Sequence, residues 1–353
     1  MMILAIDLAK ARSLFCWHDV VKGSHRMKTI PSTPQAFHDA LTREKVERVI
    51  IEVCDMAGWI KDLCDSLQIP IQIANGNTQG WRWRNVKKKT DKDDVLKLVS
   101  LSLTNQLPTV NLPDRPVRQW KSLILYRQKL IERRTRIKNK IHAILVSEGK
   151  AMSGGKKAWS QESLAALCRL ARPLGDCPIE ELWRGQLHME LEALDDLDRL
   201  IATLDKKLDA LGENNAAVIR LRTIPGVGAR LSELVVAVID DPGRFKNVRE
   251  VGSYAGLVPR RYQSGSMDRS GRISKAGCSK LRKLLLEVAW GMLRHNAHGQ
   301  SVFKRISKGQ KTRRKQAAVA LARRVLGWCW AMLRDGTDWR DPAGGAAPSP
   351  VAT

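Results

Sequence analysis

The stretch ILAID at residues 3–7 decides the fold of the N-terminal part, because four apolar residues run directly into an acid. Such a run is typical of a buried strand. The β-branched stretch RVIIEV at residues 48–53 predicts a second buried strand that also reaches an acid, Glu52. Strands alternating with helices indicate an α/β layer fold. The other expected elements are strands at 13–20 and 71–74, and helices at 36–45, at 57–67 and from Thr90 and Asp91 onward.

The length of 353 residues suits two or three domains. The α/β part is expected over residues 1–107, a helical part over 108–213, and a mainly helical part over 214–340. Residues 341–353 are rich in Ala, Gly, Pro and Ser, which predicts a disordered tail. The expected fold class is therefore α/β plus all-α.

The middle part has apolar side chains at steps of three and four in two stretches, at residues 120–144 and 187–211. This spacing forms a narrow apolar seam, which predicts a coiled coil or a long helical hairpin. The first stretch is rich in Lys and Arg, and the second in Asp and Glu. The two arms are therefore suited to pair with each other, or with a second copy in a homo-oligomer (dimer or tetramer).

The third part contains a Pro-Gly-Val-Gly turn at residues 225–228. The turn resembles a helix-hairpin-helix, whose backbone N–H groups contact phosphate without reading sequence. A plain tight turn between helices accounts for it equally well. A Gly/Ser/Arg-rich stretch follows at 260–277, in which Gln-Ser-Gly-Ser has ordinary loop composition, and helices are expected at 281–292 and 314–334.

The chain is strongly basic, with 61 Lys and Arg against 36 Asp and Glu, a formal net charge of +25. A polyanion is the simplest partner, and nucleic acid is the commonest polyanion. An acidic membrane surface is the rival, but no apolar run reaches the roughly 18 residues of a spanning helix. The N-terminus does not resemble a signal peptide, so a cytoplasmic protein is expected. The seven cysteines contain no Cys-x-x-Cys pair, which predicts small buried side chains rather than disulfides or structural zinc.

Carboxylates form the main catalytic constellation. Asp7 and Glu52 end expected strands, and Asp91 and Asp94 are three apart at a helix start, so that they share one face. Strand ends and helix starts converge at one edge of a sheet, where oxygen ligands suit Mg²⁺. Each acid alone has a simpler interpretation, as a turn residue or a helix cap. The neighbouring acids Asp55 and Asp93 are alternative ligands.

Three basic stretches are candidate nucleic-acid surfaces. The first lies just before Asp91 and interleaves Trp with cations, so that rings stack on bases while charges follow the backbone. Its residues are Trp81, Arg82, Trp83, Arg84, Lys87, Lys88 and Lys89. The other two are the arm at 127–140, which includes Arg133 and Arg134, and residues 304–315. A charge run is usually only a solvated face, but the net charge of +25 favours phosphate contact.

Taken together, these segments resemble the insertion-sequence 110 family of transposases, which includes the Piv-type DNA invertases. The segments that match the family's Asp-Glu-Asp-Asp set are AIDLAK at 5–10, IE at 51–52 and KTDKDD at 89–94. Those that resemble its C-terminal transposase domain are TIPGVG at 223–228, YAGLVPRRYQSG at 254–265, GRISKAG at 271–277 and Leu281-Arg282. The chain departs from the family at 53–55, where Val-Cys-Asp replaces Ala-Thr-Gly.

The resemblance implies a RuvC-like, ribonuclease-H-type fold for the first part and a transposase domain for the third. It implies that Ser264 of Gln-Ser-Gly is the nucleophile. It also implies a structured noncoding bridge RNA that pairs with donor and target DNA while the protein supplies the chemistry. The Mg²⁺ ligands that it implies are Asp7, Glu52, Asp91 and Asp94.

A serine beside a metal site suits a recombinase, because a phosphoserine ester stores the energy of the broken bond and religation needs no ATP. The hydroxyl needs activation by a base or a metal. Two other functions stay open: a junction-resolving metal nuclease in which water attacks, and a non-enzymatic nucleic-acid-binding scaffold. The cations expected to contact nucleic acid around Ser264 are Arg260, Arg261, Arg269, Arg272, Lys275 and Arg282.

Overall fold

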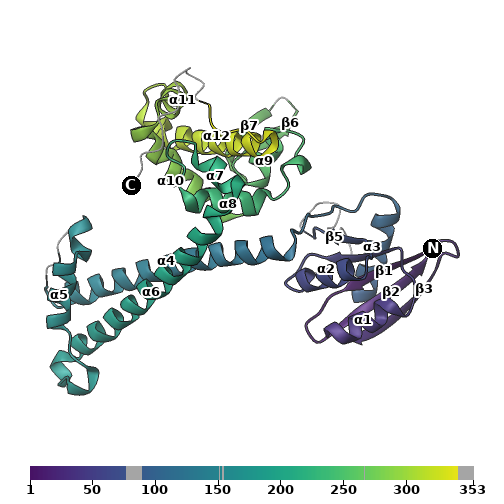
Figure 1. Ribbon diagram of the computed structural model, residues 1–353, viewed down its shortest axis with the longest axis horizontal. Helices are drawn as coiled ribbons and strands as arrows, with labels where there is room; N and C mark the ends of the chain where they lie inside the picture. Colours follow the sequence, from purple (N-terminus) through teal and green to yellow (C-terminus); the bar gives the residue numbers. More distant parts are fainter. Residues whose placement is uncertain (77–89, 151, 153–154, 266, 341–353) are drawn as a thin grey trace. The chain divides into compact units, whose positions relative to one another are not determined.

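The computed structural model describes residues 1–76, 90–150, 152, 155–265 and 267–340. The chain forms two compact units, Met1–Arg118 and Gln119–Thr353, which Figure 1 shows as an α/β part and a helical part. This division agrees with the expected α/β start and helical remainder. Within the described residues, no helix is long and apolar enough to span a membrane.

The first unit is built on a five-stranded mixed sheet with the order β3-β2-β1-β4-β5. Strand β2 runs antiparallel to both of its neighbours, β1 and β3, whereas β1, β4 and β5 run parallel to one another. This arrangement is compatible with the ribonuclease-H-type start that the resemblance implies. The strands are β1 (Met2–Asp7), β2 (Arg12–Asp19), β3 (Ser24–Pro31), β4 (Arg48–Glu52) and β5 (Ile71–Ala74).

Helices cover both faces of this sheet. Helices α1 (Pro34–Thr42) and α2 (Ala57–Ser66) pack on the face that carries Leu4 and Ile6. Helix α3 (Asp91–Leu103) packs on the opposite face, which carries Ile3, Ala5 and Ile50. The two sets alternate along β1 because successive side chains of a strand point to opposite faces.

Strand β3 was not expected from the sequence. It is an edge strand with one buried residue, Ile30, and the rest of its side chains are exposed or half-buried. A strand is predicted from a sequence when apolar and polar residues alternate. An edge strand that buries so few side chains lacks this alternation. Backbone pairing with β2 therefore forms β3 with little help from the core, to which Ile30 and Met27 contribute.

The second unit contains a long pair of helices, α4 (Arg115–Ser147) and α6 (Leu182–Glu213). The helices run antiparallel, since Arg127 binds Asp205 and Arg134 binds Asp198. Leu130 packs on Leu197 at the apolar seam. The basic and acidic arms therefore pair with each other within one chain, and an oligomer stays a prediction. The connecting elements are η1 (Gly155–Trp159), α5 (Gln161–Leu170), η2 (Leu174–Asp176) and η3 (Ile179–Glu181).

A helical body with one β-hairpin completes the second unit. Helix α12 (Arg314–Asp335) lies at its centre and packs against α7 to α11, with Leu321, Val325 and Cys329 buried. The Pro-Gly-Val-Gly turn joins α7 to α8, as expected. The other elements are α7 (Ala216–Arg222), α8 (Ala229–Ile239), η4 (Pro242–Arg244), α9 (Val248–Tyr254), β6 (Pro259–Ser264), β7 (Met267–Ile273), α10 (Ser279–His295), α11 (Ala297–Ser307) and η5 (Lys311–Arg313).

The cysteines only partly match the expectation of small buried side chains. Cys16, Cys64 and Cys329 are buried, and burial raises the pKa of Cys329 to about 12. Cys54 and Cys168 are exposed instead. A buried thiol stays protonated at neutral pH and acts as a small apolar side chain.

Candidate active site

Two carboxylates end neighbouring parallel strands of the first unit. Asp7 is the last residue of β1 and Glu52 the last residue of β4, and the register pairs Ile6 with Ile51 one position earlier. Alternation along β1 places Asp7 on the α3 side of the sheet, in line with Ala5. Alternation along β4 places Glu52 on the same side, one step beyond Ile50. The two acids therefore share one edge and one face.

Helix α3 brings a third carboxylate to this face. Asp94 is only 9% exposed and lies on the α3 stripe that packs against the sheet through Val95 and Leu98. A carboxylate is costly to bury unless its charge is compensated. Asp91 begins the helix one turn earlier and is exposed. Of the two acids that the sequence pattern selected on α3, Asp94 is therefore buried and Asp91 is exposed.

The two alternative acids lie differently. The Asp93 carboxylate accepts hydrogen bonds from the Thr90 backbone N at 3.1 Å and from Thr90 Oγ1 at 2.6 Å, completing a capping box. Such a box satisfies backbone groups at a helix start. Asp55 is exposed in the turn before α2. The cap accounts for Asp93, and Asp55 lies beyond the strand end that holds Glu52.

The donor set fits a divalent cation in residue type. Carboxylate oxygens are the ligands that hard divalent cations take, and Asp7, Glu52 and Asp94 belong to the layer between the sheet and α3. Across the described part of the chain, no three His, Cys, Asp or Glu side chains are already grouped as metal ligands. Binding of an ion at this edge would therefore require these side chains to turn toward it.

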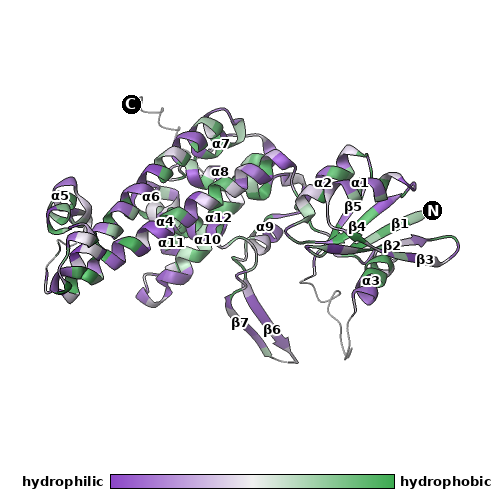
Figure 2. Cartoon of the chain, turned by 90° about the horizontal axis from the view of Figure 1, so that it is seen from below, coloured by the Kyte–Doolittle hydropathy of each residue, from purple (hydrophilic) through white to green (hydrophobic). Residues whose placement is uncertain are grey.

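Ser264 lies at the tip of the β-hairpin formed by β6 and β7. It is the last residue of β6, pairs with Met267, and is exposed. Gly265 follows it with φ +56°, in the left-handed region that tight hairpin turns use. The hairpin projects from the helical body and is hydrophilic along both strands (Figure 2). No strands were expected from the sequence in the Gly/Ser/Arg-rich stretch 260–277, because neither β6 nor β7 buries a face.

The cations of the hairpin have different partners. The Arg261 Nε donates to Asp268 Oδ1 at 2.9 Å, and this hydrogen bond holds the pKa of the Asp268 carboxyl below its usual value. The Arg260 guanidinium donates to the Ser274 backbone oxygen at 3.3 Å. Arg269, Arg272 and Lys275 are exposed. None of these three side chains forms an ion pair with another described residue, so their charge is available to phosphate.

A crossing of two chain segments supports the base of the hairpin. Gly256 and Gly277 have φ of +67° and +66°, and a Cβ on either would overlap backbone of the other segment. The Arg282 guanidinium donates to the carbonyl oxygens of Ala255, Ala276 and Gly277 at the same place. Arg282, expected to contact nucleic acid, therefore holds this crossing through its side chain.

Gly277→Ala is expected to lower the free energy of unfolding by about 2–4 kcal/mol, from left-handed strain and overpacking together. The added methyl would displace the crossing that orients the hairpin, so activity should fall as well. Urea denaturation measures the first effect. Gly265→Ala is the matched control, since Gly265 has φ +56° but open space around it. Equal losses in the two variants would mean that the crossing is not tightly packed.

The remaining expected nucleic-acid residues lie in two places. Residues 81–84 and 87–89 lie outside the described residues. On α4, Arg133 is exposed, whereas Arg134 forms an ion pair with Asp198 at 2.8 Å. Arg134 therefore helps to join the two long helices.

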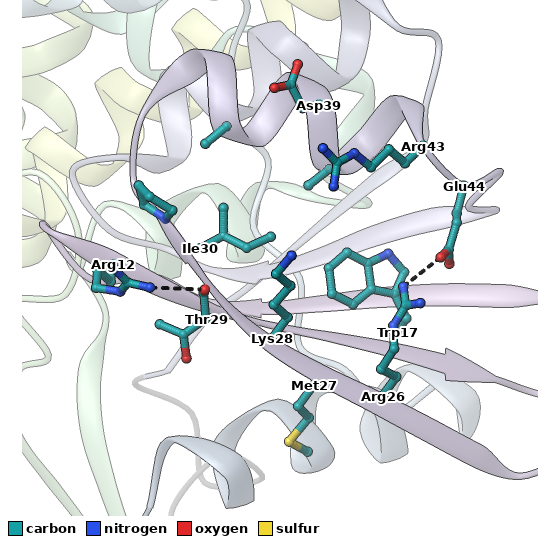
Figure 3. A pocket seen from close by; sticks show the side chains of 13 residues that line it. Arg12, Trp17, Arg26, Met27, Lys28, Thr29, Ile30, Asp39, Arg43 and Glu44 are labelled. Atoms are coloured by element: carbon teal, nitrogen blue, oxygen red, sulfur yellow. Dashed lines mark hydrogen bonds and ion pairs between the residues drawn. The ribbon is translucent and has the colours of Figure 1, made fainter.

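A pocket of about 640 Å³ between β3 and α1 was not foreseen (Figure 3). Its cations are partly offset by acids, as Arg26 binds Glu44 at 2.6 Å and stacks on Trp17 at 4.8 Å. In the sequence, the only indication of this pocket was that Arg26 and Lys28 are two residues apart, which places both on one face of a strand. The charged residues that line it are Arg12, Arg26, Lys28, Asp39, Arg43 and Glu44.

Comparisons with known proteins show which family the chain resembles. A transposase model of the DEDD, IS110 type matches residues 4–148, and a model described as "Transposase IS116/IS110/IS902 family" matches residues 219–304. The chain is 29% identical over 340 residues to a probable family 20 transposase of Pseudomonas aeruginosa, covering 96% of this chain and 98% of that protein. It is 27% identical over 343 residues to the transposase for insertion sequence element IS1111A of Coxiella burnetii, covering 94% and 89%.

A third relative has a different name. The pilin gene-inverting protein of Moraxella lacunata is 32% identical over 145 residues, covering 40% of this chain and 44% of that protein. The two family models and the relatives named as transposases place the chain in the class of DNA-transposing enzymes. Within that class, the chain belongs to the IS116/IS110/IS902 family of transposases.

Proposed function

We propose that this transposase cuts and rejoins DNA through a covalent phosphoserine at Ser264, with Mg²⁺ held by Asp7, Glu52, Asp91 and Asp94. The observation that carries the proposal is the placement of Asp7 and Glu52 on one face and edge of the sheet, beside the buried Asp94. The exposed Ser264 at a hairpin tip supports the second half. The relative named as a pilin gene-inverting protein supports recombination as the reaction class.

The chain's own residues carry the proposed step. The Ser264 hydroxyl loses its proton, and Oγ forms an ester bond to phosphorus. The bond from phosphorus to one deoxyribose oxygen breaks, and that oxygen gains a proton. In the reverse step a deoxyribose hydroxyl of another strand attacks the phosphoserine and releases Ser264. The number of phosphate ester bonds stays constant, so no outside energy source is needed.

The accessory groups of the step are cations. A divalent ion, when bound, supplies Lewis-acid stabilisation of the charge that develops on phosphate. Arg269 is exposed on the strand that pairs with the one ending in Ser264, opposite Tyr262, and is suited to bind a non-bridging oxygen. The nuclease alternative uses the same acids with water as the nucleophile, and it produces free ends.

We also propose that a structured RNA binds the exposed face of α4 and directs the choice of donor and target DNA. Lys129, Arg133, Arg136 and Lys140 are exposed and lie at steps of four, three and four, which places them on one helix face. This face lies to one side of the seam that packs on α6. A line of cations at this spacing matches the phosphates of a nucleic-acid backbone.

The test of the proposed function uses the purified chain, its RNA, labelled donor and target DNA, and Mg²⁺ on a denaturing gel. We expect a labelled band that migrates with the protein and that a chelator prevents. Proteolysis and mass spectrometry should then locate the phosphodiester on the peptide that contains Ser264. Cut DNA without any adduct would instead favour the hydrolytic nuclease.

Asp7→Asn is expected to slow adduct formation about 10²–10³-fold, the usual cost of removing one preorganised electrostatic group. Asn keeps the size of the side chain but removes the charge that would hold the ion. Asp55→Asn, in the exposed turn after β4, is the matched control and should react normally. Single-turnover gel assays measure both rates. An unchanged rate in Asp7→Asn would remove this acid from the proposed site.

A further inference from the structure

A groove of about 650 Å³ lies at the base of the hairpin that bears Ser264. It separates the end of β7 from the first half of α12, and its walls are mostly apolar. The apolar lining residues are Leu257, Pro259, Ile273, Val319 and Ala320. A groove of this size admits one nucleotide but not a paired duplex.

Four cations line the same groove: Arg272, Lys275, Lys315 and Arg323. No carboxylate lines it, and none of the four forms an ion pair with another described residue. Their positive charge is therefore available to an anionic ligand.

The side chain of one cation and the backbone of another are held by their surroundings. The Arg323 side chain packs so closely on Gly252 that a Cβ there would lie 3.2 Å from Arg323 Cδ. Lys275 has φ +58°, which is rare for a residue other than Gly, and its backbone N donates to the Gly256 oxygen at 3.1 Å. Groups that are ordered before binding lose less entropy when a ligand arrives.

We propose that this groove binds one unpaired nucleotide of the DNA strand that Ser264 attacks. The apolar walls contact the base, and the cations contact its flanking phosphates. The amide of Gln316, which also lines the groove, has both donor and acceptor atoms for a base edge. This inference rests on the proposed role of Ser264.

The position of the groove favours DNA over RNA as its occupant. Pro259 lines the groove and Ser264 ends the same strand five residues later. This separation is about 17 Å at 3.4 Å per residue, or about five nucleotide steps at the rise of one B-DNA strand. A DNA strand bound at Ser264 is therefore long enough to reach the groove. An RNA bound on the exposed face of α4 does not have to enter the groove in order to guide the reaction.

The test measures binding without chemistry. The full chain carrying Ser264→Ala is titrated, in chelator, with a labelled duplex that has a short unpaired gap in one strand, and with the fully paired duplex. We expect roughly tenfold tighter binding of the gapped duplex, since contacts to one unstacked base contribute that much. A fluorescent base analogue in the gap should change its emission on binding.

Two variants identify the groove. Ala320→Phe fills it, and Lys315→Gln removes an exposed cation without touching the core; both should lower the preference for the gap to about twofold or less. Arg305→Gln, an exposed cation on α11, is the control and should weaken both duplexes alike. Equal binding of gapped and paired DNA, or an unchanged preference in both variants, would overturn the inference.

Two further outcomes separate the hypotheses. Tighter binding when the gapped strand is RNA would assign the groove to RNA and overturn the inference for DNA. The binding assay needs neither metal nor nucleophile, so failure of the phosphoserine route leaves its result intact. Conversely, a normal adduct in Ala320→Phe and Lys315→Gln with an unchanged gap preference would refute the groove alone.

Discussion

Replacing Ser264 with Ala is expected to abolish the covalent protein–DNA adduct and to slow strand transfer at least about 10⁴-fold, since loss of a nucleophile costs that much or more. Ser264 is exposed at the end of β6. The left-handed backbone conformation of the turn belongs to Gly265, so the turn does not depend on the Ser264 side chain. The substitution therefore removes one hydroxyl and leaves the hairpin in place. The expected loss is chemical rather than structural.

Three measurements distinguish a chemical loss from a structural loss in Ser264→Ala. Denaturing gels measure the adduct, a strand-transfer assay measures the rate, and equilibrium binding to uncut DNA should match the unaltered chain. Ser270→Ala is the matched control, because Ser270 is an exposed serine on β7 of the same hairpin. Normal cleavage with free ends in Ser264→Ala would reject the phosphoserine route and favour attack by water.

Arg230→Met is expected to lower the free energy of unfolding by about 3–5 kcal/mol, the cost of leaving a buried charge without its partner. Glu233 on α8 is 0% exposed and accepts two hydrogen bonds from Arg230, at 2.7 and 3.0 Å. Arg230 also binds Asp205 and Asp209 on α6, at 2.9 and 2.6 Å. These contacts join the long helical pair to the helical body.

The loss in Arg230→Met should depend on pH. Burial raises the pKa of the Glu233 carboxyl above its usual value of 4.5, although the Arg230 hydrogen bond opposes the shift. A raised pKa means that the folded state binds the proton more tightly than the unfolded state. Ionised Glu233 therefore costs stability above pH 4.5, and the cost disappears as pH falls from the folded pKa to that value. Without Arg230 the folded pKa rises further, so the deficit should shrink from pH 7 toward pH 5.

Urea denaturation at both pH values measures this deficit. Arg199→Met is the control, because Arg199 is 71% exposed in its ion pairs with Asp195 and Asp196, and exposed pairs contribute about 0–1 kcal/mol. A double variant with Arg230→Met and Glu233→Leu should regain most of the stability, since it removes both buried charges. A deficit below about 1 kcal/mol in Arg230→Met would show that water reaches Glu233.

The candidate acids could be found from the sequence because strand ends are visible there. Strands β1 and β4 are buried on both faces, so each is a continuous apolar run, and the acid that ends it stands out. The sequence did not distinguish Asp93 from Asp94. That choice depends on the capping box at Thr90, which sets which side of α3 faces the sheet. Burial of Asp94 is thus a tertiary result.

Other structural features could not be predicted from apolar runs in the sequence. Strand β3 and the β6–β7 hairpin bury almost no side chains, so hydrophobic alternation is absent from both. The groove at the hairpin base had a partial signal, since Lys315, Val319 and Arg323 are spaced four apart on one helix. Its other wall comes from residues between 257 and 275, at least forty residues earlier in the sequence.

By itself, the sequence determined the α/β start, the helical remainder, the pairing potential of two oppositely charged arms, and the acids at two strand ends. These features follow from local periodicity and charge, which one stretch of chain carries alone. Tertiary structure decided that the arms pair within one chain, that Arg282 holds a backbone crossing, and that Glu233 and Asp94 are buried. Each of these results depends on which distant segment of the chain packs against the residue. The local sequence pattern carries no information about that segment.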